Sequence, residues 1–138
     1  MFRWIIQGKL IAAHRPRATG QRLGQVPKSS VNEWIRLATR GLGARSIVCL
    51  LDKRELRRYG SLPQDLLSYY RARKLRVVHI PSPNHKRPRL TEVDLKKVWR
   101  AYQRLPKPVL IHCSAGISRT GAAVRYIKLR EKPSGIAS

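Results

Sequence analysis

The stretch from residue 109 to residue 129 constrains the fold of this chain more than any other part of it. An apolar run, Val109 to Ile111, is followed by the residues HCSAGISRTG and then by a helix-like stretch, residues 122–129. This order predicts a buried strand, a tight loop and a helix. Backbone N–H groups of such a loop can converge on one anion, and the positive N-terminal end of the helix adds to their field. The sequence therefore predicts a phosphate site between the strand and the helix.

Individual residues of this loop have chemistry that suits a phosphate. The same field favours the thiolate of Cys113, which is the nucleophilic form of cysteine. Arg119 follows after five intervening residues, and its planar fork can hold two phosphate oxygens at once. Gly116 allows a close approach of the backbone to a ligand, and we interpret Gly121 as the residue that lets the helix start against the strand.

The loop resembles the HCxxGxxR(S/T) signature of the cysteine-dependent protein tyrosine phosphatases, and G-I-S-R-T-G is similar to their compact dual-specificity branch. The matching residues are His112, Cys113, Gly116, Arg119 and Thr120. The alternative is a buried cysteine beside an ordinary surface arginine. Several chemically linked residues match in the expected strand, loop and helix context, which favours the signature.

The resemblance implies a role for each residue of the signature. Cys113 would attack phosphorus and form a phosphocysteine intermediate, and Arg119 would hold the phosphate. Thr120 would donate a hydrogen bond to the departing thiolate, while His112 would face the loop backbone and fix Cys113. The remaining loop residues would bind the phosphate, and these are Ser114, Ala115, Gly116, Ile117 and Ser118.

Transfer of phosphate to a cysteine needs a proton donor for the leaving oxygen. In the phosphatases that the chain resembles, this donor is an Asp in the pattern Ile-Pro-x-Pro-Asp. The matching stretch here runs from Ile80 to Pro88 and holds Asn84 at the carboxylate position. Asn cannot donate an acidic proton. We expect Asn84 and its neighbour His85 to contact the substrate, and His85 is one substitute for the acid because histidine titrates near neutral pH.

The few carboxylates of the chain supply the other substitute. Four of the seven are explained by helix starts and a fifth lies near the end of the chain, namely Glu33, Asp65, Glu92, Asp94 and Glu131. Asp52 and Glu55 remain. Asp52 directly follows the predicted strand 47–51, at the edge of an open parallel sheet where ligand sites collect. Asp52 is therefore our candidate acid, with a surface or helix-start residue as the alternative.

Apolar runs alternate with helix signals along the chain. We expect strands within residues 3–12, 47–51 and 75–80, before the strand at 109–111. Helices are expected after a Ser30 to Glu33 capping box, from Pro63, and after a Thr91 and Asp94 cap pair. This alternation predicts an α/β fold with a central, mostly parallel twisted sheet flanked by helices.

The length predicts a single dual-specificity phosphatase-like catalytic domain over residues 1–138. Members of the family usually continue with further helices after the signature helix, whereas only 19 residues follow Arg119 in this chain. We therefore expect the usual C-terminal helices to be lacking.

The net charge of the chain indicates which kinds of partner it attracts. Lys and Arg number 30 against 7 Asp and Glu, which gives a formal charge of +23, and such a field attracts nucleic acid and other polyanions. Two cysteines do not make a disulfide framework, and a thiolate catalyst needs a reducing compartment, so we expect the cytoplasm or the nucleus. No apolar run is long enough for a membrane span. The chemistry requires no cofactor, and no metal site is predicted.

Three functions remain open from the sequence. The first is a phosphatase that hydrolyses phosphate monoesters of phosphotyrosine, phosphoserine or phosphothreonine proteins. The second is an RNA 5′-triphosphatase or polyphosphate-directed phosphatase, because a pyrophosphate leaving group gains little from an acid and the chain is strongly basic. The third is a phosphate-binding module without catalytic turnover.

Overall fold

Five strands form one sheet in the computed structural model, which describes residues 1–17, 24–83 and 90–131. Across the sheet they lie in the order β1 (Arg3–Ile6), β2 (Leu10–Ala13), β5 (Val109–His112), β3 (Ser46–Cys49) and β4 (Arg76–His79). Only β1 runs antiparallel to its neighbour, and the other pairs are parallel. The predicted α/β fold with a mostly parallel sheet is confirmed.

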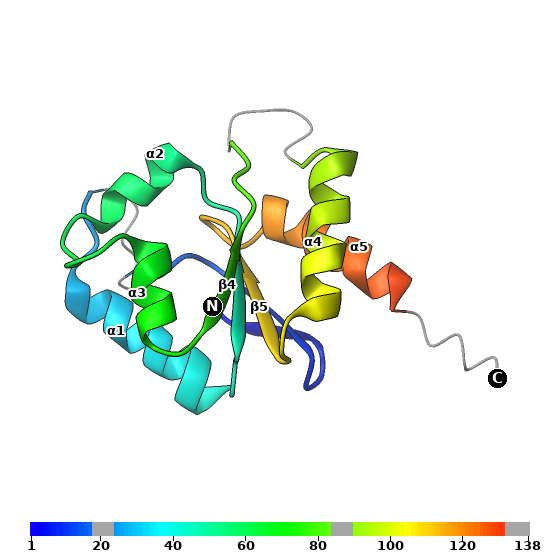
Figure 1. Cartoon of the computed structure of the whole chain (residues 1–138), viewed down its shortest axis with the longest axis horizontal. Helices are drawn as coiled ribbons and strands as arrows, with labels where there is room; N and C mark the ends of the chain where they lie inside the picture. Colours follow the sequence, from blue (N-terminus) through cyan, green and yellow to red (C-terminus); the bar gives the residue numbers. More distant parts are fainter. Residues whose placement is uncertain (18–23, 84–89, 132–138) are drawn as a thin grey trace.

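Helices cover both faces of the sheet (Figure 1). One face carries α1 (Lys28–Arg36), the π-helical turn η1 (Leu37–Gly41), α2 (Lys53–Leu56), the 3₁₀ turn η2 (Arg57–Tyr59) and α3 (Leu66–Ala72). The other face carries α4 (Glu92–Arg104) and α5 (Ser118–Arg130).

The side chains of β3 show how each strand supplies both faces. Ile47 and Cys49 pack with α1 and α3, whereas Val48 and Leu50 pack with α4 and α5, and all four are fully buried. This alternation follows from the period of two in a strand. Burying a side chain such as Ile47 contributes about 1.5–3 kcal/mol. The centre of the sheet is therefore a rigid support for β5, which lies between β2 and β3.

Three helix starts differ from the sequence prediction. α1 begins at Lys28 after Pro27, and Glu33 pairs with Arg36 at 2.6 Å instead of forming a capping box with Ser30. α3 begins at Leu66, after Asp65, whose carboxylate accepts a hydrogen bond from the Ser68 N–H. The Thr91 and Asp94 cap pair at the start of α4 is confirmed.

The third difference concerns α5, which begins at Ser118, so Gly121 lies inside the helix and not at its start. A Cβ atom added at Gly121 would meet nothing within 4 Å. The interpretation of Gly121 as the residue that lets the helix start against the strand is wrong, because α5 already begins at Ser118.

α5 is the last helix of the described ranges, and residues 132–138, which bear on the expected lack of C-terminal helices, lie outside them. Within the same ranges, no helix is both long enough and apolar enough to cross a bilayer.

Candidate active site

The loop after β5 holds Cys113 at the end of a buried strand. Cys113 is 2% exposed, and the backbone N–H of Gly116 donates a hydrogen bond to its Sγ at 3.3 Å. A hydrogen bond of this kind stabilises negative charge on sulfur. The Ser114 carbonyl accepts a hydrogen bond from the backbone N–H of Arg15 at 2.9 Å, so the loop is tied to the chain that follows β2.

Gly116 is required by the packing of this loop. Its φ of +75° lies in the left-handed region, which favours glycine. A Cβ atom at Gly116 would lie 2.7 Å from the carbonyl carbon and oxygen of Ala13 and from the amide nitrogen of His14. Arg3 Nη2 also donates to the Gly116 carbonyl at 3.3 Å. The close approach that the sequence predicted for a ligand is thus made to the backbone at the end of β2.

Arg119 is buried beneath the loop, although it is a cation. It is 1% exposed, and Nη1 and Nη2 donate to the two carboxylate oxygens of Glu55 at 2.8 and 2.7 Å. Nη1 also donates to the carbonyls of Leu50 and Ser82, at 3.2 and 2.7 Å. Burial alone would lower the pKa of Arg119, but the hydrogen bonds and charge of Glu55 outweigh it and raise the pKa.

These contacts decide which donors of the guanidinium are left without an acceptor. A guanidinium has five N–H donors, and the bidentate pair with Glu55 uses its end, between Nη1 and Nη2. Nε–H and the second N–H of Nη2 form the remaining edge of the fork, and they have no acceptor within the described part of the chain. Two parallel donors on one edge match two oxygens of a phosphate.

Glu55 is the functional residue that the sequence analysis left without a role. A capping box begins α2: the Asp52 carboxylate accepts from the Glu55 N–H at 2.8 Å, and the Glu55 carboxylate accepts from the Asp52 N–H at 3.0 Å. Glu55 then reaches Arg119 with the same carboxylate. The signal was the D-K-R-E spacing directly after a buried strand, which places a glutamate at the edge of the sheet where the loop lies.

Asp52 caps the start of a helix in the structure. Its side chain is the N-cap of α2 and holds the first turn that carries Glu55. Capping uses one carboxylate oxygen of Asp52. The alternative that Asp52 is a helix-start residue therefore explains its position. Its use as the acid remains a prediction.

His112 faces the loop backbone from the end of β5. It is fully buried, with Nδ1 3.2 Å from the Cys113 carbonyl and Nε2 2.8 Å from the Tyr70 hydroxyl. Trp34 contacts the imidazole edge to face, with ring centroids 5.4 Å apart. Burial lowers the pKa of His112 to about 3, so the ring is neutral at physiological pH. A neutral imidazole with a hydrogen bond at each nitrogen fixes the backbone next to Cys113.

Thr120 lies in the first turn of α5 with a buried hydroxyl. Its Oγ1 has no hydrogen-bond partner among the residues that the structure describes. A buried hydroxyl without a partner is costly, which is consistent with a donor reserved for a bound group. Its predicted bond to the departing thiolate remains a prediction.

The rest of the predicted site divides between the rim of the Cys113 loop and the stretch from Ile80 to Pro88. Ala115, Ile117 and Ser118 are exposed on the rim. Asn84 and His85 lie outside the described residues. The stretch that leads to them begins against the site, because Ser82 is buried and its carbonyl accepts from Arg119.

The comparisons with known proteins agree with this geometry at the level of the fold. No family model matches the chain, and no curated protein does. Solved structures that match include Tk-PTP and the catalytic core of a PP-IP phosphatase, and the chain has their fold. The resemblance to the protein tyrosine phosphatases that was inferred from the loop is confirmed at the level of the fold.

Two of these structures are of Tk-PTP. A mutant form matches with a TM-score of 0.66 and 22% identity, over 95% of this chain and 72% of that chain. The active form matches with a TM-score of 0.60 and 24% identity, over 94% and 78%. A third is the core catalytic domain of the PP-IP phosphatase SIW14 from S. cerevisiae, with a TM-score of 0.62 and 18% identity, over 89% of this chain and 61% of that chain.

Proposed function

We propose that this chain is a cysteine-dependent phosphatase that works through a phosphocysteine intermediate on Cys113. The sulfur of the thiolate attacks phosphorus, an S–P bond forms, and the bond from phosphorus to the leaving oxygen breaks. The leaving oxygen takes a proton from an acid or from water. Water then attacks phosphorus, the S–P bond breaks, and inorganic phosphate and the thiolate are released, with Thr120 as the donor to sulfur.

One observation carries the proposal. Cys113 Sγ accepts a hydrogen bond from an N–H of its own loop, and Glu55 holds Arg119 in an orientation that leaves two of its donors without an acceptor among the described residues. A buried, preoriented guanidinium stabilises charge that develops on phosphate oxygens without reorganising during the reaction. Such a pair of groups suits phosphoryl transfer better than simple phosphate binding.

Phosphoproteins are the substrates that we propose first. Phosphotyrosine, phosphoserine and phosphothreonine carry monoesters, which match the dual-specificity branch that the loop resembles. The exposed rim residues Ala115, Ile117 and Ser118 let a folded or extended polypeptide reach the loop. We propose that the enzyme works in the cytoplasm, with the nucleus as the alternative, because its thiolate must stay reduced.

A polyphosphate substrate is the second candidate, and Asn84 favours it. A 5′-triphosphate RNA or another polyphosphate releases a stable leaving group, so an Asn that positions water suffices. The charge of +23 attracts such polyanions, and SIW14, one of the similar structures, is a PP-IP phosphatase. RNA would bind mainly through its phosphates.

The experiment compares a phosphotyrosine peptide with a triphosphate-ended RNA, using the native chain and Asn84→Asp. An ester gains from a donated proton by a factor on the order of 10²–10⁴, and a pyrophosphate gains little. We expect Asn84→Asp to raise ester hydrolysis and to change triphosphate hydrolysis much less. Ester rates that stay flat across the pH range where Asp titrates would contradict the inference that residue 84 occupies the position of the proton donor.

Asp52→Asn and His85→Gln then identify the acid in use. Only the residue that supplies the proton removes a limb of the pH–rate profile when it is replaced. Cys113→Ser separates a catalyst from a binding module. We expect it to abolish turnover and to keep binding of a phosphate analogue, whereas turnover that survives this substitution would sink the proposal.

A further inference from the structure

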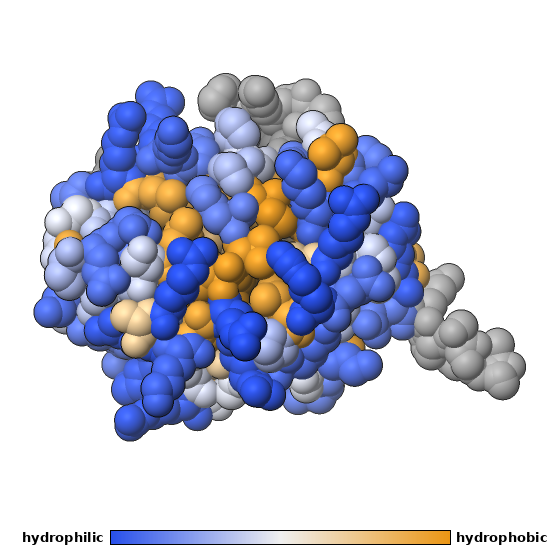
Figure 2. Space-filling view, in the orientation of Figure 1, coloured by the Kyte–Doolittle hydropathy of each residue, from blue (hydrophilic) through white to orange (hydrophobic). Residues whose placement is uncertain are grey.

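A basic groove runs along the edge of the sheet that β4 forms, away from Cys113. Figure 2 shows apolar surface flanked by hydrophilic side chains on this face, and the groove has a volume of about 660 Å³. Its apolar lining consists of Leu75, Val77, Val78 and Leu105, and its cations are Arg71, Lys74, Arg76 and Arg104. We call these eight residues the β4 groove.

β4 offers outward-facing backbone groups to this groove. It is the last strand of the sheet and is bonded to β3 alone. Arg76 N–H donates to the Arg45 carbonyl at 3.1 Å, and Ile80 N–H donates to the Cys49 carbonyl at 3.0 Å. Since backbone groups alternate in direction along a strand, the N–H and C=O groups of Val77 and His79 point away from β3. A strand edge of this kind is a template for another strand.

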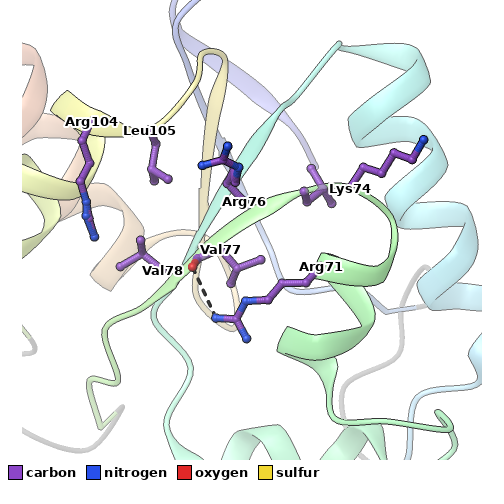
Figure 3. Close-up of a pocket in the computed structure, with 8 residues that line it drawn as sticks. Arg71, Lys74, Arg76, Val77, Val78, Arg104 and Leu105 are labelled. Atoms are coloured by element: carbon purple, nitrogen blue, oxygen red, sulfur yellow. Dashed lines mark hydrogen bonds between the residues drawn. The ribbon is translucent and has the colours of Figure 1, made fainter.

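The cations lie on both sides of this edge. Arg71, on α3, and Arg104, at the end of α4, flank β4 from opposite sides in Figure 3. Arg71 Nη2 donates to the outward carbonyl of Val77 at 3.4 Å, which is a long and weak bond. None of the four cations of the β4 groove makes an ion pair with a carboxylate among residues 1–17, 24–83 and 90–131.

The β4 groove is remote from the loop of Cys113. β3, β4 and β5 are parallel, and the loop follows the carboxyl end of β5. Lys74, Leu75 and Arg76 lie at the amino end of β4, which is the opposite end of the sheet. Phosphate chemistry at Cys113 therefore does not account for these cations.

We propose that the β4 groove binds an extended acidic segment of a partner protein, which adds to β4 as a further strand. The partner's N–H and C=O groups would pair with those of Val77 and His79. Its apolar side chains would cover Val77 and Val78, while its acidic side chains would reach Arg71 on one face and Arg104 on the other.

Two other occupants fit the groove less well. RNA would pair with the cations, but the lining has no aromatic side chain on which a base could stack. An apolar floor and outward strand hydrogen bonds serve a polypeptide instead. A second copy of the chain would bring another +23 charge to the same surface, so repulsion opposes it.

The test measures binding of a fluorescently labelled peptide, acetyl-Glu-Glu-Val-Val-Glu-Glu-amide, to the full chain without any phosphate substrate. In an extended strand this order places Glu and Val side chains on both faces. The double variant Arg71→Glu with Arg104→Glu should weaken binding by about tenfold, because two attractions become repulsions. The matched control is Lys96→Glu with Arg125→Glu, which changes the net charge equally at exposed sites outside the groove. We expect the control to weaken binding by less than about twofold.

Strand addition has its own readout. A peptide with Pro in place of both Val residues keeps its charge but lacks two consecutive N–H groups, one of which must face β4. We therefore expect it to bind at least about tenfold more weakly. Amide hydrogen exchange at Val77 and His79 should slow when the Glu-Val peptide binds.

Four results would overturn the proposal. Equal binding of the Pro peptide would reduce the site to nonspecific charge attraction. Tighter binding of an oligouridylate of the same charge, weakened by the same groove variant, would assign the β4 groove to RNA. Equal weakening by the groove variant and its control, or absence of binding, would show that the β4 groove does not bind an acidic strand. The cations would then serve only to oppose edge-to-edge aggregation.

Discussion

Arg119 and the cations of the β4 groove show how differently one chain uses the same kind of side chain. Arg119 is 1% exposed and bonded to Glu55, Leu50 and Ser82. Arg71 and Arg104 are exposed and make no ion pair within the described ranges. Burial and pairing fix the guanidinium of Arg119 in one orientation, as catalysis requires. Exposure leaves the groove cations free to adapt to a partner, as docking requires.

The largest effect is expected from Arg119→Lys, which keeps the charge and removes the fork. A lysine can neither bridge Glu55 with two bonds nor offer a parallel pair of donors to phosphate. Turnover should drop by about 10²–10³, the size of the loss when one oriented donor is removed from an active site.

Arg71→Lys is the matched control for that substitution, and we expect it to leave turnover within about twofold. Steady-state kinetics on a phosphate ester measure both variants. Equal losses would show that the distinction between Arg119 and the groove cations is wrong.

Glu55→Ala is expected to have the next largest effect, on stability. It leaves the guanidinium of Arg119 buried without its counter-charge, and removal of one partner of a buried pair costs about 3 kcal/mol or more. Urea unfolding measures this loss. Glu55→Gln should recover part of it, because its carbonyl oxygen still accepts one hydrogen bond.

Arg71→Ala, on the exposed side of the comparison, should change the free energy of unfolding by about 0.5 kcal/mol or less. If Glu55→Ala were equally mild, Glu55 would not be what holds Arg119 in place.

The pH dependence of stability should report on His112. Burial lowers its pKa to about 3 in the folded chain, whereas an unfolded histidine titrates at about 6.5. Between these values only the unfolded chain takes up the proton, so stability decreases as pH falls from about 6.5 toward 3. The slope approaches about 1.4 kcal/mol per pH unit. Above about 6.5 the ring is neutral in both states and contributes no slope.

Urea unfolding at a series of pH values, with and without His112→Gln, measures this contribution. Burial also lowers the pKa of the half-buried His14, so His14→Gln serves to subtract its share. An unchanged slope in His112→Gln would refute the assignment to His112.

The smallest of these effects is expected from Gly121→Ala, and Gly116→Ala should act in the opposite direction. Gly121→Ala should stabilise the chain by about 0.5–1 kcal/mol, because the site is helical and a Cβ meets nothing within 4 Å. Gly116→Ala should instead destabilise it, since its Cβ would overlap the Ala13 backbone at 2.7 Å and its φ is +75°. Thermal unfolding of both variants checks the signs, and two shifts of the same sign would contradict the packing described for the loop.

Local patterns account for what the sequence predicted correctly. The strand, loop and helix around Cys113 come from contiguous residues, and so does the cap pair of Thr91 and Asp94. The contact between Glu55 and Arg119 joins residues 64 positions apart, which no local spacing reveals. A carboxylate after a strand could as well be an acid, and for that reason Asp52 was the candidate.

Helix starts and strand order explain the other differences. Ser30 and Glu33 have the spacing of a capping box, but α1 begins about one turn earlier, after Pro27, and Glu33 pairs with Arg36. The β4 groove depends on β4 being an edge strand. Strand order is a property of the whole sheet, so the four cations, which come from three separate elements and a turn, could not be grouped from sequence.

Trapping the intermediate on Cys113 tests the central claim most directly. The chain is mixed with a phosphate ester, quenched with acid within one turnover, digested and analysed by mass spectrometry. We expect one phosphoryl group on the peptide that contains Cys113, none in Cys113→Ser, and accumulation in Thr120→Ala, where breakdown of the intermediate should slow more than its formation. Turnover with no phosphoryl group on Cys113, or with the group on another residue, would contradict the mechanism.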